Sequence, residues 1–184
     1  MHRNDTVQNA RYTKMNTLLY LLHQYNSFSI SSSNERDFVK LDYQVEKNHL
    51  TIIQKYSFEG CKPLEYRLIL EIKNNELTTA FSSEFIDDKE NFYHADYPYI
   101  KIPAERNDFV QWEYQFNSDV WVKCTASYVL FEHNGKRCNP LLIERLIDDK
   151  GKKNLVSEYY MPLGGIYLLR VGNREFYFNS FTMN

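Results

Sequence analysis

The sequence predicts a mainly β protein, built as a single strongly curved antiparallel meander sheet or half-open barrel with one N-terminal helix. Apolar and polar residues alternate along many short stretches, and Asn-Gly or Gly-Asn pairs separate several of them. Aromatic residues make up 16% of the 184 residues. Such alternation is typical of half-buried strands, the turn pairs suit two-residue hairpins, and aromatic side chains favour pleated surfaces. None of the predicted strands is apolar on both faces, which excludes a parallel α/β sheet.

The N-terminal part of the chain differs from the rest. Apolar residues recur at three- and four-residue steps from Val7 to Tyr25, which predicts one amphipathic helix. A polar, serine-rich stretch, residues 26–36, follows the helix and is predicted to be a linker or an irregular first strand. We therefore divide the chain into an N-terminal helix and linker, residues 1–36, and an antiparallel β domain, residues 37–184.

Strand patterns begin at Phe38 and continue to Phe181, giving about ten predicted strands. Three pairs of turn residues between them, Asn74-Asn75, Asn134-Gly135 and Gly172-Asn173, predict tight hairpins. Two of these turns set the following residues opposite one another: Lys73 and Glu76, His133 and Lys136, Phe131 and Cys138.

The stretch 87–97 is charged and aromatic, lacks a clear alternation, and is predicted to be an exposed loop. It contains the only cluster of histidine and carboxylates in the chain, around His94-Ala-Asp96. A solvated loop explains this cluster better than a metal or acid–base site. None of the five histidines has zinc-ligand spacing to another histidine or to a cysteine, so no metal and no other cofactor is expected.

No catalytic motif is present. The sequence lacks a Gly-x-Ser-x-Gly elbow, a Gly-rich phosphate loop and an HExxH pair. Cys124 alternates onto an apolar face, which predicts a small core residue rather than a nucleophile. We expect a protein that is not an enzyme; a hydrolase with converging carboxylates is the least favoured alternative. Five glutamates are predicted to be solvated on polar strand faces: Glu65, Glu71, Glu113, Glu144 and Glu158.

Charge and cysteine content limit the partners. The net charge is −2, with scattered Lys and Arg, so nucleic acid is not expected as a partner. No run approaches the roughly 20 apolar residues of a membrane span, and the N-terminus does not have the pattern of a signal peptide. The Asn134-Gly135 hairpin sets Cys124 roughly 23 Å along the ladder from Cys138, so all three cysteines are expected to be reduced.

Seven aromatic residues share apolar strand positions and are candidate ligand-binding residues: Tyr56, Tyr66, Phe81, Trp112, Tyr114, Tyr128 and Tyr159. An ordinary packed core is the simpler interpretation. The alternative is a concave surface whose hydroxyl-tipped aromatics line an elongated apolar cavity. On that alternative the protein binds an apolar or amphipathic ligand, such as a lipid or an acylated peptide. A rival hypothesis is a protein–protein module, an inhibitor or assembly factor, that uses a sheet edge or the 87–97 stretch.

Four segments within residues 97–171 form a further pattern: Tyr97-Pro-Tyr-Ile-Lys-Ile-Pro103, Trp112, Gly135-Lys-Arg-Cys138 and Glu158-Tyr-Tyr-Met-Pro-Leu-Gly-Gly-Ile-Tyr-Leu-Leu-Arg170. Together they resemble small bacterial envelope proteins of unknown function. The fold of those proteins is similar to that of lipoprotein-localisation factors, an incomplete antiparallel barrel that shelters acyl chains, with a helix inside or over the opening. The resemblance implies an envelope or periplasmic location and a lipid or lipoprotein partner, and it implies no catalytic residues. We expect a monomer or weak dimer.

Overall fold

The described part of the chain consists of strands and turns. The computed structural model of the protein describes residues 27–31, 36–46, 49–73, 76–86, 89–133, 135–161 and 165–181. These ranges contain no helix, and all paired strands in them are antiparallel, which confirms the mainly β class. The amphipathic helix predicted from Val7 to Tyr25 lies outside the described residues.

Fourteen strands occur within the described ranges. Their bounds are β1 (Ser27–Ser31), β2 (Phe38–Glu46), β3 (His49–Ser57), β4 (Leu64–Lys73), β5 (Glu76–Ile86), β6 (Lys89–Ile100), β7 (Phe109–Gln115), β8 (Val120–Tyr128), β9 (Phe131–His133), β10 (Lys136–Cys138), β11 (Leu141–Asp149), β12 (Lys152–Met161), β13 (Gly165–Val171) and β14 (Arg174–Phe181). Of these, β9 and β10 form a separate hairpin, inserted between β8 and β11.

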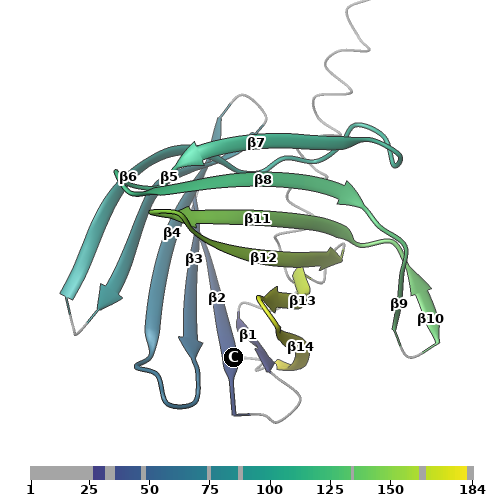
Figure 1. The fold of residues 1–184 in the computed structure, drawn as a ribbon, viewed down its shortest axis with the longest axis horizontal. Coiled ribbons are helices and arrows are strands. Elements are labelled where there is room, and N and C mark those ends of the chain that lie inside the picture. Colours follow the sequence, from purple (N-terminus) through teal and green to yellow (C-terminus); the bar gives the residue numbers. More distant parts are fainter. Residues whose placement is uncertain are drawn as a thin grey trace, which may run out of the picture.

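The other twelve described strands form one open sheet in the order β6-β5-β4-β3-β2-β1-β14-β13-β12-β11-β8-β7. The first and last strands, β1 and β14, pair in the middle of the sheet, so the two edges are β6 and β7. These edge strands are consecutive in the chain and are joined by residues 101–108. The sheet curls, and β7, β8, β11 and β12 cross above the fan of β2 to β6 (Figure 1). The curl gives the sheet an inner, concave face.

The predicted hairpin registers are confirmed. Lys73 lies opposite Glu76, and Cys138 lies opposite Phe131. Gly135 and Gly172 have φ values of 73° and 58°, a left-handed conformation that glycine adopts without a steric penalty. Local turn chemistry therefore sets the pairing of these strands, as two-residue hairpins require.

The predicted exposed loop at 87–97 is wrong for the residues that the structure describes, because residues 89–97 belong to strand β6. Two register shifts in the β5–β6 pairing break the alternation that marks a regular strand. Pro98 also lies within β6, and proline is tolerated there because an edge strand pairs on one side only. The aromatic side chains of Tyr97 and Tyr99 are buried, whereas Asp96 is exposed.

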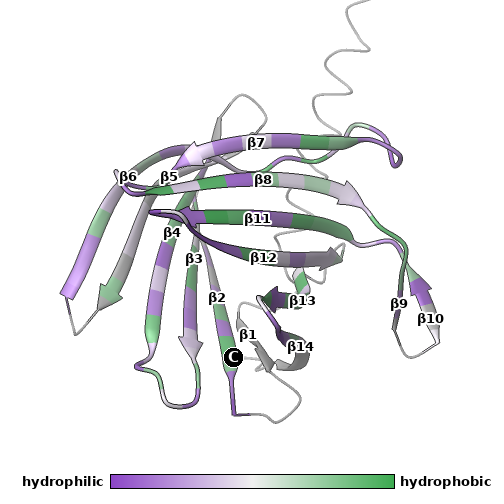
Figure 2. Ribbon diagram, viewed as in Figure 1, coloured by the Kyte–Doolittle hydropathy of each residue, from purple (hydrophilic) through white to green (hydrophobic). Residues whose placement is uncertain are grey.

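The inner face of the curled sheet carries one hydrophobic core. Apolar and polar residues alternate along its strands (Figure 2). Fully burying one large apolar side chain contributes about 1.5–3 kcal/mol, so this core is the main source of stability. The buried members of the core are Val39, Leu41, Leu50, Ile52, Leu68, Leu70, Tyr99, Ile100, Trp112, Val122, Cys124, Ala126, Leu141, Ile143, Tyr160, Ile166, Leu169 and Phe176.

Candidate ligand-binding cavity

Side chains join the two edges of the sheet where backbone pairing is missing. In the described residues β6 and β7 are the ends of the sheet order and do not form a ladder with each other. The indole Nε1 of Trp112 on β7 donates a hydrogen bond to the Pro98 carbonyl on β6, at 2.9 Å. The rings of Tyr97 and Tyr114 stack across the same seam, with centroids 3.8 Å apart. These contacts join the two edges of the open sheet through side chains.

A cavity of about 520 Å³ lies inside the curl. Small-molecule sites in proteins usually measure about 300–1,000 Å³. Strands from both halves of the sheet contribute its walls, which are mainly aromatic and aliphatic. Three of the lining residues, Asp119, Asp149 and Asn154, are exposed, and we place the mouth of the cavity beside them, near the turns that follow β7 and β11. The wall residues are Tyr56, Tyr66, Leu68, Tyr97, Tyr99, Tyr114, Phe116, Val120, Val122, Ile147 and Val156.

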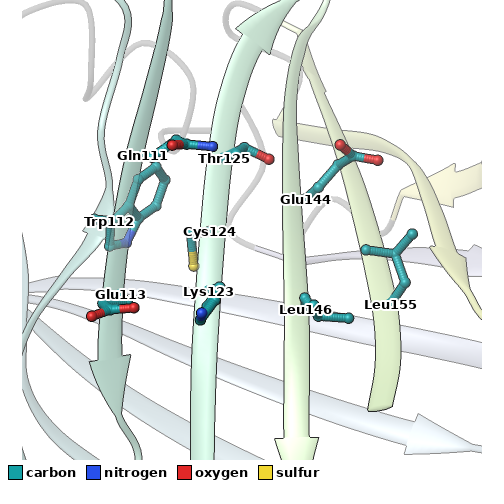
Figure 3. Close-up of a pocket in the computed structure, with 9 residues that line it drawn as sticks. All are labelled: Gln111, Trp112, Glu113, Lys123, Cys124, Thr125, Glu144, Leu146 and Leu155. Carbon is teal, nitrogen blue, oxygen red and sulfur yellow. The ribbon is translucent and has the colours of Figure 1, made fainter.

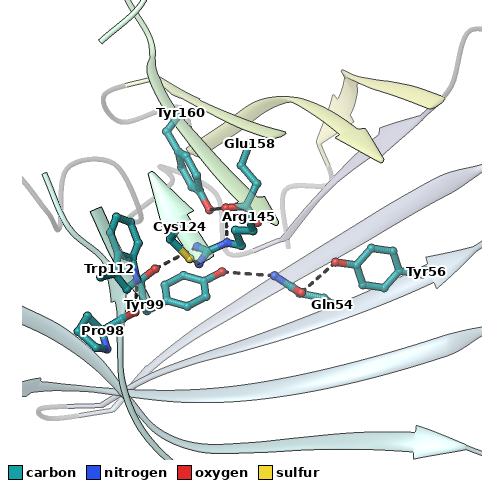
Figure 4. A network of polar contacts seen from close by, with 9 residues as sticks. All are labelled: Gln54, Tyr56, Pro98, Tyr99, Trp112, Cys124, Arg145, Glu158 and Tyr160. Carbon is teal, nitrogen blue, oxygen red and sulfur yellow. Dashed lines mark hydrogen bonds and ion pairs between the residues drawn. The ribbon is translucent and has the colours of Figure 1, made fainter. Parts of the chain in front are cut away.

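An ion pair lies at the inner wall of the cavity. Arg145 on β11 and Glu158 on β12 are only 6% and 7% exposed, and both line the cavity. The Arg145 Nε donates to the Glu158 carboxylate at 3.1 Å, and its Nη2 donates to the Tyr99 carbonyl at 3.0 Å (Figure 4). Its Nη1 lies 3.5 Å from the Cys124 thiol, and the Tyr160 hydroxyl donates to Glu158 at 3.0 Å. The buried charges are therefore paired and hydrogen-bonded, as burial in a low-dielectric interior requires.

The polar groups continue from the ion pair across the interior. The Gln54 amide Nε2 donates to the Tyr99 hydroxyl at 3.5 Å, and the Tyr56 hydroxyl donates to the Gln54 carbonyl oxygen at 3.0 Å (Figure 4). Side chains from β3 and β6 thus reach toward those from β11 and β12. This polar layer gives the cavity fixed hydrogen-bonding groups between its aromatic walls.

The prediction that Glu158 is solvated on a polar strand face is wrong. Asn154, Val156, Glu158 and Tyr160 alternate onto the inner face of β12, opposite inner residues of β11. The consecutive residues Tyr159 and Tyr160 make either face of β12 appear apolar in the sequence. Among the side chains that the structure describes, Glu158 is the only buried carboxylate, and its charged neighbour is an arginine rather than a second carboxylate.

Burial keeps the cavity tyrosines neutral. Removal from water raises the pKa of Tyr56, Tyr99 and Tyr114 well above 10, since the phenolate would lose its hydration. For Tyr99, the negative charge of Glu158 adds to this rise in pKa, while Arg145 opposes it. Near neutral pH these three side chains are therefore hydroxyl groups rather than phenolates.

We expect this burial to be visible in an alkaline titration. At about pH 11, fewer of the 15 tyrosines should be ionised in the folded protein than in denaturant, where all 15 should titrate with a midpoint near pH 10. Because these pKa values are higher in the folded state, their contribution to stability is complete below about pH 10 and is lost as the pH rises through the folded values. The ultraviolet absorbance of the phenolate groups measures how many tyrosines are ionised. Ionisation of all 15 tyrosines with the fold intact would contradict the burial.

The structure brings three of the seven predicted ligand-binding residues, Tyr56, Tyr66 and Tyr114, into the cavity wall. Trp112 lies in the seam between β6 and β7 instead, where its indole binds the Pro98 carbonyl. These four residues come from three strands, β3, β4 and β7, and the curl of the sheet gathers them. The sequence signal that identifies these residues is their position on the apolar face of each predicted strand.

Two of the other three predicted residues, Tyr128 and Tyr159, do not line the cavity. Tyr128 lies opposite Leu141, at the far end of β8 from the cavity residue Val120. Tyr159 lies on the outer face of β12, where its ring is 5.4 Å from that of Phe131. The backbone of Phe81 belongs to β5, and its side chain is outside the described part of the structure.

Four functional groups of the cavity were missed from the sequence. Tyr97 lies at the end of the stretch predicted to be a loop and Tyr99 follows it, while Gln54 and Arg145 occupy inner positions where an apolar residue is expected. A signal for Arg145 does exist. The turn at Lys150-Gly151 sets Asp149 opposite Lys152, which places Arg145 and Glu158 on one face as diagonal neighbours.

A second hollow, of about 670 Å³, lies on the outer face of β7, β8, β11 and β12 (Figure 3). Its outward side chains include Glu113 opposite Lys123, and the apolar pair Leu146 and Leu155. Leu155 is 45% exposed. This hollow is a surface depression on the face opposite the cavity, and it provides control positions for the experiments below.

Comparison with known protein families, with curated proteins and with solved structures finds no match for this chain. Within the described ranges, no helix is long and apolar enough to cross a membrane. The same residues contain no group of three or more His, Cys, Asp or Glu side chains placed to hold a metal ion.

Proposed function

We propose that the protein binds an apolar or amphipathic small molecule, such as a lipid or an acylated peptide, in the concave cavity of its sheet, without catalysing a reaction. One observation carries this proposal: the cavity of about 520 Å³ joins an aromatic wall to a satisfied polar layer. Sites of this composition bury the apolar body of a ligand and orient its polar end.

The position of the cavity within the core supports the proposal. One part of the inner face is solidly packed, with Phe176, Leu141 and Ile143 fully buried. The walls around Tyr66 and Tyr114 instead surround open space, although their side chains are large enough to fill a core. Tyrosine suits such a wall because its ring contributes apolar area and its hydroxyl can bind a ligand or water. The envelope location implied by the sequence resemblance belongs to the same proposal.

The rival function, a protein-interaction module, has one observation in its favour. Phe92 on the edge strand β6 is 61% exposed, and Phe109 on the edge strand β7 is 68% exposed. Because residues 89–97 form β6, the sheet edge and most of the 87–97 stretch are one surface. Exposed aromatics along a strand edge are a typical surface for strand addition by a partner.

Uptake of an uncharged apolar dye, N-phenyl-1-naphthylamine, tests the proposed function. We expect saturable binding of one dye per chain, with a rise in dye fluorescence as it leaves water. Unlabelled dodecanol should displace the dye. Absence of saturable uptake by the folded protein would exclude the cavity as a binding site and favour the partner on β6.

A further inference from the structure

We infer that the ligand binds through an uncharged polar group, such as a hydroxyl or an ester carbonyl, and that the cavity rejects free carboxylates and ammonium groups. This inference rests on the proposed function and specifies its ligand class. The observation behind it is that every charge on the cavity wall already has a partner or an opposite charge beside it.

The charge deep in the cavity is cancelled. The Arg145 guanidinium would attract a ligand carboxylate, but its Nε already binds the Glu158 carboxylate at 3.1 Å. Three of its nitrogens are directed to Glu158, Cys124 and Tyr99. A second carboxylate entering this site would meet Glu158 at short range, and it would lose its hydration without gaining an unpaired cation. A ligand ammonium would likewise be repelled, because it would lie close to the positively charged Arg145 guanidinium.

The mouth of the cavity is also balanced. Asp119 forms an ion pair with Lys150, with their charged atoms 3.1 Å apart. Asp149 lies opposite Lys152 across the hairpin of β11 and β12. Neither sign of charge dominates among these four residues, so they are not expected to attract ligands of one charge over the other.

Neutral hydrogen-bonding groups line the remaining surface. Four tyrosines and one glutamine line the cavity: Tyr56, Tyr97, Tyr99, Tyr114 and Gln54. Hydroxyl and amide groups donate and accept hydrogen bonds without requiring a charge on their partner. An uncharged amphiphile, with an apolar tail against the aromatic walls and an oxygen among these groups, matches this surface.

Three competitors with the same twelve-carbon tail test the inference: dodecanol, dodecanoate and dodecyltrimethylammonium, each displacing the bound naphthylamine dye. We expect dodecanol to bind at least about tenfold tighter than either charged compound, because burying an unpaired charge is costly. Equal or tighter binding of dodecanoate or of the ammonium compound would overturn the inference and leave the proposed function standing. Failure of the dye and of all three competitors to bind would overturn the proposed function itself.

A variant with an altered charge tests the same inference from the protein side. Glu158→Gln keeps the size of the side chain and an oxygen acceptor for Arg145, and it removes the negative charge. We expect dodecanoate binding to strengthen by about tenfold, since the guanidinium then offers an unpaired charge to the ligand. Glu113→Gln makes the same change on the outer face and should leave all three affinities unchanged. No gain for Glu158→Gln with its fold retained, or an equal gain for Glu113→Gln, would contradict the inference.

Discussion

Replacing Glu158 with alanine is expected to lower the free energy of unfolding by about 3–5 kcal/mol, because it leaves the Arg145 guanidinium buried without its counterion. Arg145 is 6% exposed and cannot recover its hydration without rearrangement of the inner face. The Tyr160 hydroxyl loses its acceptor in the same variant. Urea unfolding, followed by circular dichroism, measures the change.

Two further variants make this prediction specific. Glu144→Ala removes a carboxylate from the outer face of the neighbouring strand, and we expect it to change stability by about 0.5 kcal/mol or less. The double variant Arg145→Met, Glu158→Leu removes both buried charges and should recover most of the lost stability, since apolar replacements of buried pairs are often neutral. A loss below about 1 kcal/mol for Glu158→Ala would mean that the pair is solvated.

The parts of the fold that depend on local chemistry could be predicted from the sequence. The Asn134-Gly135 turn fixed the pairing of Phe131 with Cys138, and the alternation of β8 placed Val122 and Cys124 on the buried face. These features depend on residues that are adjacent or two apart. A two-residue turn fixes which residues pair, and the alternation of side chains along a strand fixes which of them face the core. The sequence is therefore sufficient to predict both features.

The features that depend on distant residues could not be predicted. Strand β6 departs from regular alternation because its register shifts twice against β5, and the sequence of β6 alone does not contain that information. The burial of Glu158 depends on which face of β12 turns inward, which the consecutive residues Tyr159 and Tyr160 leave ambiguous. The cavity itself arises because β3 and β4 curl toward β11 and β12, and side-chain periodicity does not specify curvature.

Filling the cavity is expected to abolish ligand binding. Val156 lines the cavity wall on β12, and the large indole of a Val156→Trp variant would occupy the space that the ligand needs. Because open volume is already present there, we expect the stability cost to stay within about 1–3 kcal/mol, the usual range for overpacking. The neighbouring Leu155 points to the outer face and is 45% exposed. Leu155→Trp is therefore a matched control, and it should bind ligand like the wild type.

Parallel titration of the wild type, Val156→Trp and Leu155→Trp with the naphthylamine dye tests most directly whether the cavity is the binding site. Thermal melting of each protein first establishes that it is folded. We predict saturable binding of one dye per chain for the wild type and for Leu155→Trp, and none for Val156→Trp. Equal uptake by all three proteins would place the dye elsewhere on the molecule and contradict the cavity as the site, and so would uptake by none.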